Sequence, residues 1–107
     1  MTKDDLEKRA KEIIVNKKSI PYVFGLFERK VSPPHLVAHI TQSNNFGADN
    51  IVYKRKNIIQ LELTTDYIDL ELEEQIETKI LFDTYWEKYE TDIESEKIHN
   101  VSYFFEI

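Results

Sequence analysis

The stretch SNNFGADNIVYKRKNIIQLELTTD, from Ser43 to Asp66, decides the fold because it holds the clearest strand pattern in the chain. Apolar residues alternate with polar ones in its second half, at Ile59, Leu61 and Leu63. This period of two is typical of a half-buried β-strand. If the strand is continuous from Ile51, Arg55 and Asn57 fall on its apolar face. Either a turn or bulge interrupts the strand there, or this end of the strand extends past the core into solvent.

The residues before this strand predict further strands and their connections. HLVAHITQS, residues 35–43, alternates in polarity, and SIPYVFGLFE, residues 19–28, is rich in β-branched and aromatic residues. The apolar face of the first of these segments comprises Leu36, Ala38 and Ile40. VSPPH, residues 31–35, is a connection because its two prolines cannot donate ladder hydrogen bonds. NNFGADN, residues 44–50, is a turn or loop, since Asn and Gly tolerate positive φ.

Two segments have the 3.6-residue apolar period of a helix that packs on one side. The first covers residues 3–17, and a Thr-x-x-Asp capping box begins at Thr2. The second covers residues 69–82 and is capped by Asp69 or Asp66. The apolar stripes consist of Leu6, Ala10, Ile13 and Ile14 in the first helix, and of Leu72, Ile76 and Ile80 in the second.

The remaining C-terminal residues are strand-like at both ends, around Trp86 and over a final alternation of apolar residues. That alternation consists of Val101, Tyr103, Phe105 and Ile107. Strands joined by short turns pair antiparallel, and two helices with one apolar stripe each cover one face of a sheet. We therefore expect a single α+β domain over residues 1–107. It would have two layers, with a mostly antiparallel sheet of four to five strands and two helices packed on one face.

Charge is distributed unevenly along the chain. The net charge is −6, yet residues 1–60 contain 11 Lys and Arg against 6 Asp and Glu, whereas residues 61–107 contain 3 against 14. Such asymmetry fits a basic binding surface, two surfaces that attract each other between copies, or solvated faces that differ by chance. The chain has no cysteine, no apolar signal segment at its start and no run of roughly 20 apolar residues for a membrane span. We expect a soluble, cytoplasmic protein without membrane contact.

The sequence predicts no catalytic, cofactor-binding or metal-binding residues. None of the 20 acids has a neighbour that visibly tunes its pKa, and two glycines cannot form a phosphate-binding loop. Of the three histidines, His35 and His39 would lie on one strand face, while His99 lies far along the chain. At ~3.3 Å per residue the first two are about 13 Å apart, which is too far to share an ion with bonds near ~2.0–2.1 Å.

The cations Lys54, Arg55 and Lys56 follow Tyr53, a combination that can also indicate nucleic-acid binding. Three or four cations neutralise few phosphates, however, and the acidic second half would repel a duplex. A solvated strand end is the better interpretation. Contact with DNA would require many copies that present the patch together.

Three segments resemble small tail-completion or tail-terminator proteins of long-tailed phages and of prophages in Gram-positive bacteria. They are SNNFGADNIVYKRKNIIQLELTTD (43–66), DLELEEQIETKI (69–80) and YWEKYETDIESEKIHNVSYFFEI (85–107). That family has an Ala-Asp-Asn turn, a strand with an "ELYT"-like end and an Ile-Glu-Ser-Glu stretch, in this order. The corresponding segments here are Ala48–Asn50, Glu62–Thr65 and Ile93–Glu96. Thr64 stands where the family often has an aromatic, and the likeness covers residues 20–107.

The resemblance implies a structural role without catalysis or cofactor. Proteins of this family adopt an α+β fold and form a ring, usually a hexamer, at the head-proximal end of the tail tube, where they stop its growth and meet the head connector. The implied partners are further copies of the chain, a tail-tube protein, a head-connector protein and, non-specifically, DNA in the lumen. The protein would be made in the bacterial cytoplasm and end in the virion at the tail–head junction. The alternatives are another neck or head–tail connector protein, or a small cytoplasmic adaptor that binds a protein by its sheet edge.

Seven residues around the turn form the predicted site of contact with a neighbouring subunit or with the lumen. They are Lys54, Arg55, Lys56, Asn44, Asn45, Phe46 and Asp49. The cations would meet an acidic surface of the next copy or face the lumen, and the polar loop would contact tube or connector proteins. Head-to-tail contacts between a positive and a negative surface close into rings when the rotation permits.

Overall fold

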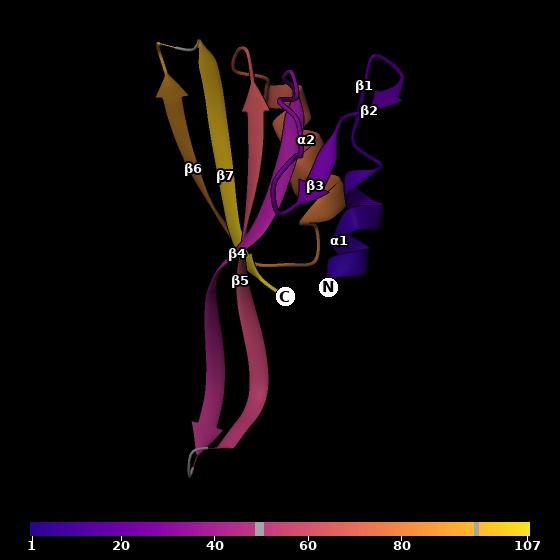
Figure 1. The fold of residues 1–107 in the computed structure, drawn as a ribbon. Helices are drawn as coiled ribbons and strands as arrows, with labels where there is room; N and C mark the ends of the chain where they lie inside the picture. Colours follow the sequence, from indigo (N-terminus) through magenta and orange to yellow (C-terminus); the bar gives the residue numbers. More distant parts are fainter. Residues whose placement is uncertain (49–50, 96) are drawn as a thin grey trace.

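The protein has an α+β fold in two layers, as the sequence predicts (Figure 1). The computed structural model describes the backbone of residues 1–48, 51–95 and 97–107, and the side chains of residues 1–41, 57–95 and 97–107. The elements are α1 (Lys3–Ala10), β1 (Ile14–Val15), β2 (Lys18–Ser19), β3 (Tyr22–Phe24), β4 (His35–Ala48), β5 (Ile51–Thr65), α2 (Leu70–Gln75), the π-helix η1 (Ile76–Ile80), β6 (Trp86–Ile93) and β7 (Ile98–Glu106).

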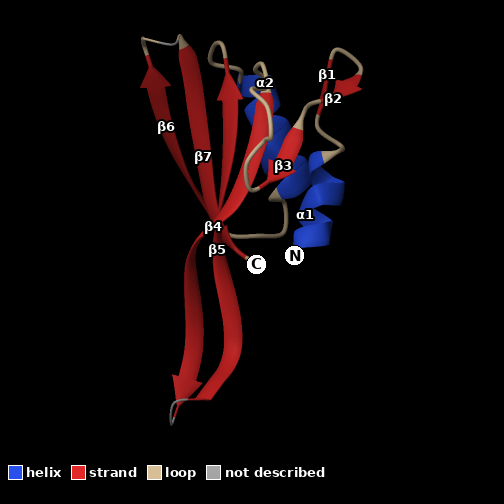
Figure 2. Cartoon of the chain, in the orientation of Figure 1, coloured by secondary structure: helices blue, strands red, loops and turns tan. Residues whose placement is uncertain are grey.

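The main sheet has five strands in the order β3-β4-β5-β7-β6 (Figure 2). All neighbouring pairs are antiparallel except β3 and β4, which are parallel with Tyr22 opposite Leu36. The expectation that successive strands pair antiparallel is therefore wrong for this pair. The connection over residues 25–34 is long enough to return the chain to the starting end of β3, as a parallel pair requires. Gly25 begins this return with φ of +116°, and its N–H donates to the carbonyl of Ala38 at 2.7 Å.

The core lies between one face of this sheet and the helices α1, α2 and η1, which all lie on that face (Figure 1). The buried apolar residues are Leu6, Ala10, Ile13, Ile20, Leu36, Ala38, Ile59, Leu61, Leu63, Leu72, Ile76, Ile80, Leu81, Val101, Tyr103 and Phe105. The predicted stripe of the second helix and the predicted core faces of β5 and β7 are confirmed, except that Ile107 lies after β7 and is only partly buried. Within the part of the chain that the structure describes, no helix is long and apolar enough to cross a membrane.

The first helix is shorter than its apolar period suggests. Thr2 caps it through the predicted capping box, in which its side chain accepts from the N–H of Asp5. The helix ends at Ala10, so the predicted extent to residue 17 is wrong. Asn16 and Lys17 have φ of 53° and 66°, left-handed values that turn the chain between β1 and β2. Ile14 is consequently half-exposed instead of being part of the helical stripe.

Strand β5 runs from Ile51 to Thr65, so no turn interrupts it at residues 54–57. Its pairing with β4 has two register shifts, one between Ile40 and Gln42 and one between Phe46 and Gly47. Its partner β7 ends near Ile58, which lies opposite Glu106, and beyond this point β4 and β5 continue as a pair (Figure 1). The predicted loop over residues 44–50 is wrong in its first part, because β4 continues to Ala48. We call residues 43–48 of β4 and 51–56 of β5 the arm. Ile40, expected in the core, is 48% exposed because it lies where β4 leaves the core for the arm.

Candidate interaction surface

The arm contains six of the seven predicted contact residues, and the ladder places them directly opposite one another. Asn44 pairs with Lys56, Asn45 with Arg55, and Phe46 with Lys54. The residues 44–46 and 54–56 are separate in the sequence but therefore lie side by side in the arm. Asp49 lies outside the described residues, as do the side chains of the other six.

The second feature is the sheet face that the helices leave uncovered, which we call the open face. Because neighbouring strands are in register, its side chains form rows across β4, β5, β7 and β6. One row consists of His39, Gln60, Phe104 and Glu87, the next of Val37, Glu62, Ser102 and Tyr89, and a third of His35, Thr64, Asn100 and Thr91.

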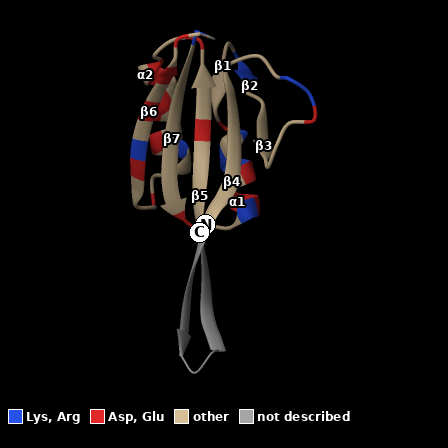
Figure 3. Ribbon diagram, turned by 60° about the vertical axis from the view of Figure 1, so that its left-hand side comes forward, with Lys and Arg blue, Asp and Glu red and all other residues tan. Residues whose placement is uncertain are grey.

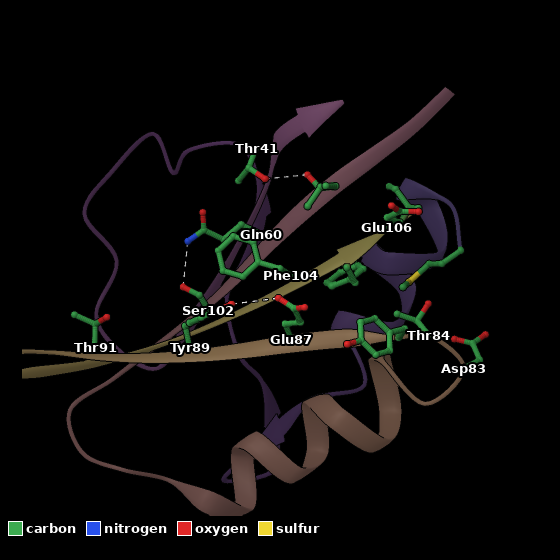
Figure 4. Close-up of a pocket in the computed structure, with 15 residues that line it drawn as sticks. Thr41, Gln60, Asp83, Thr84, Glu87, Tyr89, Thr91, Ser102, Phe104 and Glu106 are labelled. Carbon is green, nitrogen blue, oxygen red and sulfur yellow. Dashed lines mark hydrogen bonds between the residues drawn. The ribbon is translucent and has the colours of Figure 1, made fainter. Parts of the chain in front are cut away.

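The open face is concave near the base of the arm, where side chains line a hollow of about 1300 Å³ (Figure 4). The ring of Tyr89 meets Phe104 edge to face, with centroids 5.5 Å apart. The hydroxyl of Tyr89 donates to Oε2 of Glu87 at 3.2 Å, and this bond raises the pKa of the phenol. Gln60 donates to Oγ of Ser102 at 3.1 Å and to Oε1 of Glu62 at 3.2 Å. These contacts fix the orientation of polar and aromatic groups on an exposed surface.

The charge of the open face is negative. Three glutamates, Glu62, Glu87 and Glu106, occupy its positions on β5, β6 and β7. Among the residues of strands β4 to β7 whose side chains the structure describes, Lys88 is the only Lys or Arg, and its ammonium pairs with Glu73 and Glu77 on the helix side. Figure 3 shows acidic positions on β5 and β6. A partner for this face would therefore bring positive charge.

Asp83, which lines the hollow, follows η1 and forms an ion pair with Arg9 of α1. Arg9 of α1 contacts both carboxylate oxygens of Asp83, at 2.8 and 3.0 Å, and donates to the carbonyl of Ile80 at 2.9 Å. The guanidinium also lies over the ring of Phe82, 4.6 Å from its centroid. The hydrogen bond from Arg9 lowers the pKa of Asp83.

A cluster of polar residues, of which Glu73 and His99 are buried, lies on the other side of the sheet, between α2, η1 and the β6–β7 hairpin. Its members are Glu73, Glu77, Lys88, Glu90, Asp92 and His99. Lys88 reaches Glu73 and Glu77, and Tyr103 donates to Glu77 at 2.8 Å. Burial raises the pKa of Tyr103, with a further increase from its bond to Glu77. This cluster is the part of the described structure in which His, Asp and Glu come close enough to hold a metal.

Sequence reasoning missed both the open face and this cluster. The alternation in Trp86–Ile93 and in the last strand does indicate which residues face away from the core, so Tyr89 and Glu87 could be predicted as exposed neighbours. Their grouping with Gln60 and Phe104 depends on the strand order, which the sequence does not give. His35 and His39, four residues apart on β4, are not brought together with His99, which pairs across β6–β7 with Asp92.

Comparison with protein-family models found no family that matches the chain, and comparison with curated proteins found no match either.

Proposed function

We propose that this protein is a structural subunit of the tail-terminator type, which caps the head-proximal end of a phage or prophage tail tube as a ring. The observation that carries the proposal is the presence of two complementary surfaces on one small chain. The arm bears Lys54, Arg55 and Lys56, and the open face bears Glu62 and Glu87, for which the described residues supply no Lys or Arg partner.

The two surfaces support a head-to-tail contact, in which the arm of one copy lies on the open face of the next. A contact between different surfaces leaves each copy with one free arm and one free face, so it repeats until the chain of copies closes. Tyr89 and Phe104 would supply the apolar part of the contact, and Glu62 and Glu87 would pair with the cations. The ring would then meet a tail-tube protein and a head-connector protein, as the resemblance implies.

Charge reversal tests this contact directly. Changing Lys54, Arg55 and Lys56 to Glu should abolish rings, because like charges would then meet on the open face. The measurement is native mass spectrometry and negative-stain electron microscopy of the purified protein, with and without tail tubes. A matched control changes the exposed Lys8, Lys18 and Lys30 to Glu, which gives the same net charge while leaving the arm intact.

A charge-swap rescue gives the sharper result. Changing Glu62 and Glu87 to Lys should also abolish rings, and combining this double substitution with the triple substitution of the arm in one chain should restore them. Rings that persist in the arm variant, or a swap that fails to restore them although each chain is folded, would contradict the arm-to-face contact. Protein found along the whole tail tube, or not on it, would favour an adaptor or another neck protein.

A further inference from the structure

The polar cluster between α2, η1 and the β6–β7 hairpin has more acidic side chains than basic ones. Glu73 exposes 2% of its side chain, and its Oε2 has no hydrogen-bond partner among the described residues. Lys88 lies beside Oε1 of Glu73 as an ion pair, which leaves Oε2 available. With Glu77, Glu90 and Asp92 the cluster has four carboxylates against one ammonium. Glu90 and Asp92 are 50% and 67% exposed, so the buried negative charge is that of Glu73, which is costly unless cations compensate it.

The orientation of His99 leaves its ring nitrogen Nε2 without a hydrogen-bond partner among the described residues. Its Nδ1 contacts Oδ1 of Asp92, and because a carboxylate only accepts, Nδ1 carries the proton of this hydrogen bond. In the neutral ring Nε2 then has its lone pair free. This nitrogen is buried, has no hydrogen-bond partner among the described residues and lies 3.7 Å from Oε1 of Glu90. A histidine that donates its other N–H to a carboxylate is the usual arrangement of a metal ligand.

Three possible ligand atoms converge in this cluster. Nε2 of His99 and a carboxylate oxygen each from Glu73 and Glu90 all lie within 4.8 Å of one another. Around a tetrahedral zinc with bonds of ~2.0–2.2 Å, ligand atoms are separated by about 3.3–3.6 Å. The side chain of Glu90 is 50% exposed, so it can rotate to close the remaining distance without disturbing the core.

We propose that Glu73, Glu90 and His99 form a zinc site, with Asp92 as the positioning residue that fixes the tautomer of His99. Imidazole combined with carboxylate favours zinc over magnesium and calcium, which prefer oxygen ligands alone. Three protein ligands leave a fourth position for water. The ion would join α2 to the β6–β7 hairpin. This inference is independent of the proposed ring, because it concerns the interior of one chain.

The test is zinc binding by tag-free, metal-free protein in competition with a chromophoric chelator, together with the absorption spectrum of the cobalt(II) form. Wild type should bind one zinc per chain, give a tetrahedral cobalt spectrum and melt at a higher temperature with zinc. Glu90→Gln, at a half-exposed position that tolerates substitution, should weaken zinc binding at least tenfold. His99→Gln should remove the tetrahedral cobalt spectrum, and Asp92→Asn should weaken binding by about 10–100-fold.

The matched controls are His39→Gln and Glu87→Gln, which change the same residue types on the open face and should leave zinc affinity unchanged. A wild-type protein without zinc binding would overturn the proposal. Zinc binding that is equal in wild type and in the folded Glu90→Gln variant would also overturn it, because the ion would lie elsewhere. Neither result bears on ring formation, which is measured separately.

Discussion

Arg9 shows how much of this structure depends on a contact between residues far apart in sequence. It joins α1 to the segment after η1 by two hydrogen bonds to Asp83 and one to Ile80. Bidentate geometry makes such a pair stronger than a typical surface ion pair. The sequence could predict the capping box at Thr2, where the partners are three residues apart. It could not predict that Arg9 meets Asp83, because that contact depends on how the two helical segments pack.

Asp83→Asn should lower the melting temperature at neutral pH, because the variant loses the ionic part of the contact with Arg9. The pKa of Asp83 is lowered from 3.8 by Arg9, so its stabilising contribution is present above pH 3.8 and is lost as the pH falls through the lowered pKa. The difference between wild type and variant should therefore shrink below pH 3.8. Circular dichroism melting curves from pH 7 to pH 2 measure it.

Glu28→Gln is the control for Asp83→Asn, since Glu28 is an exposed acid in the connection before β4. It should melt like wild type at neutral pH. If Asp83→Asn and Glu28→Gln had the same melting temperature at every pH, the ion pair with Arg9 would contribute nothing to stability.

At the scale of elements, alternation of polarity was the reliable signal and strand pairing was not. Ile59, Leu61 and Leu63 were predictable because burial follows a period of two wherever one face meets a core. The parallel pairing of β3 was not predictable, since it depends on the path of residues 25–34. The end of α1 was not predictable either, because an apolar period continues to Ile13, which is buried just after the helix ends.

Leu61→Ala should cost about 2–5 kcal/mol of unfolding free energy, because the residue is fully buried at the centre of the sheet and its loss leaves a cavity. It lies between Ala38 of β4 and Tyr103 of β7. Ile40→Ala should cost about 1 kcal/mol or less, since half of that side chain already contacts solvent. Urea unfolding measures both, and equal costs would contradict the position of the core boundary at the base of the arm.

At the scale of the whole molecule, the described chain divides into a packed body and an arm that extends from it. The sequence predicted this division only as one of two possibilities, because cations on an apolar strand face indicate either an interruption or an extension. The pairing partners decide between them. β7 ends beside Ile58, so β5 continues beyond the body with β4 alone.

Replacing residues 44–56 by Asn-Gly should leave the body folded and remove assembly. Ser43 and Asn57 face each other in the ladder, so a two-residue hairpin turn can join them. The buried apolar residues of the core lie in residues 6–38 and 59–105, outside the replaced segment. We expect a melting temperature within a few degrees of wild type and a single-copy species by native mass spectrometry. A variant that unfolds would show that the arm stabilises the body, and a variant that still forms rings would assign assembly to another surface.

Strand β6 is an edge strand of the described sheet, and its charge affects which strands of other chains can pair with it. An edge strand offers unpaired backbone groups, and proteins prevent unwanted pairing there with charged side chains. Glu87, Glu90 and Asp92 give this edge a negative charge, against the single cation Lys88, which is turned inward. Two copies that approached edge to edge would repel each other, so uncontrolled growth of a continuous sheet from one copy to the next is disfavoured. A strand rich in lysine or arginine is the kind that this edge would accept.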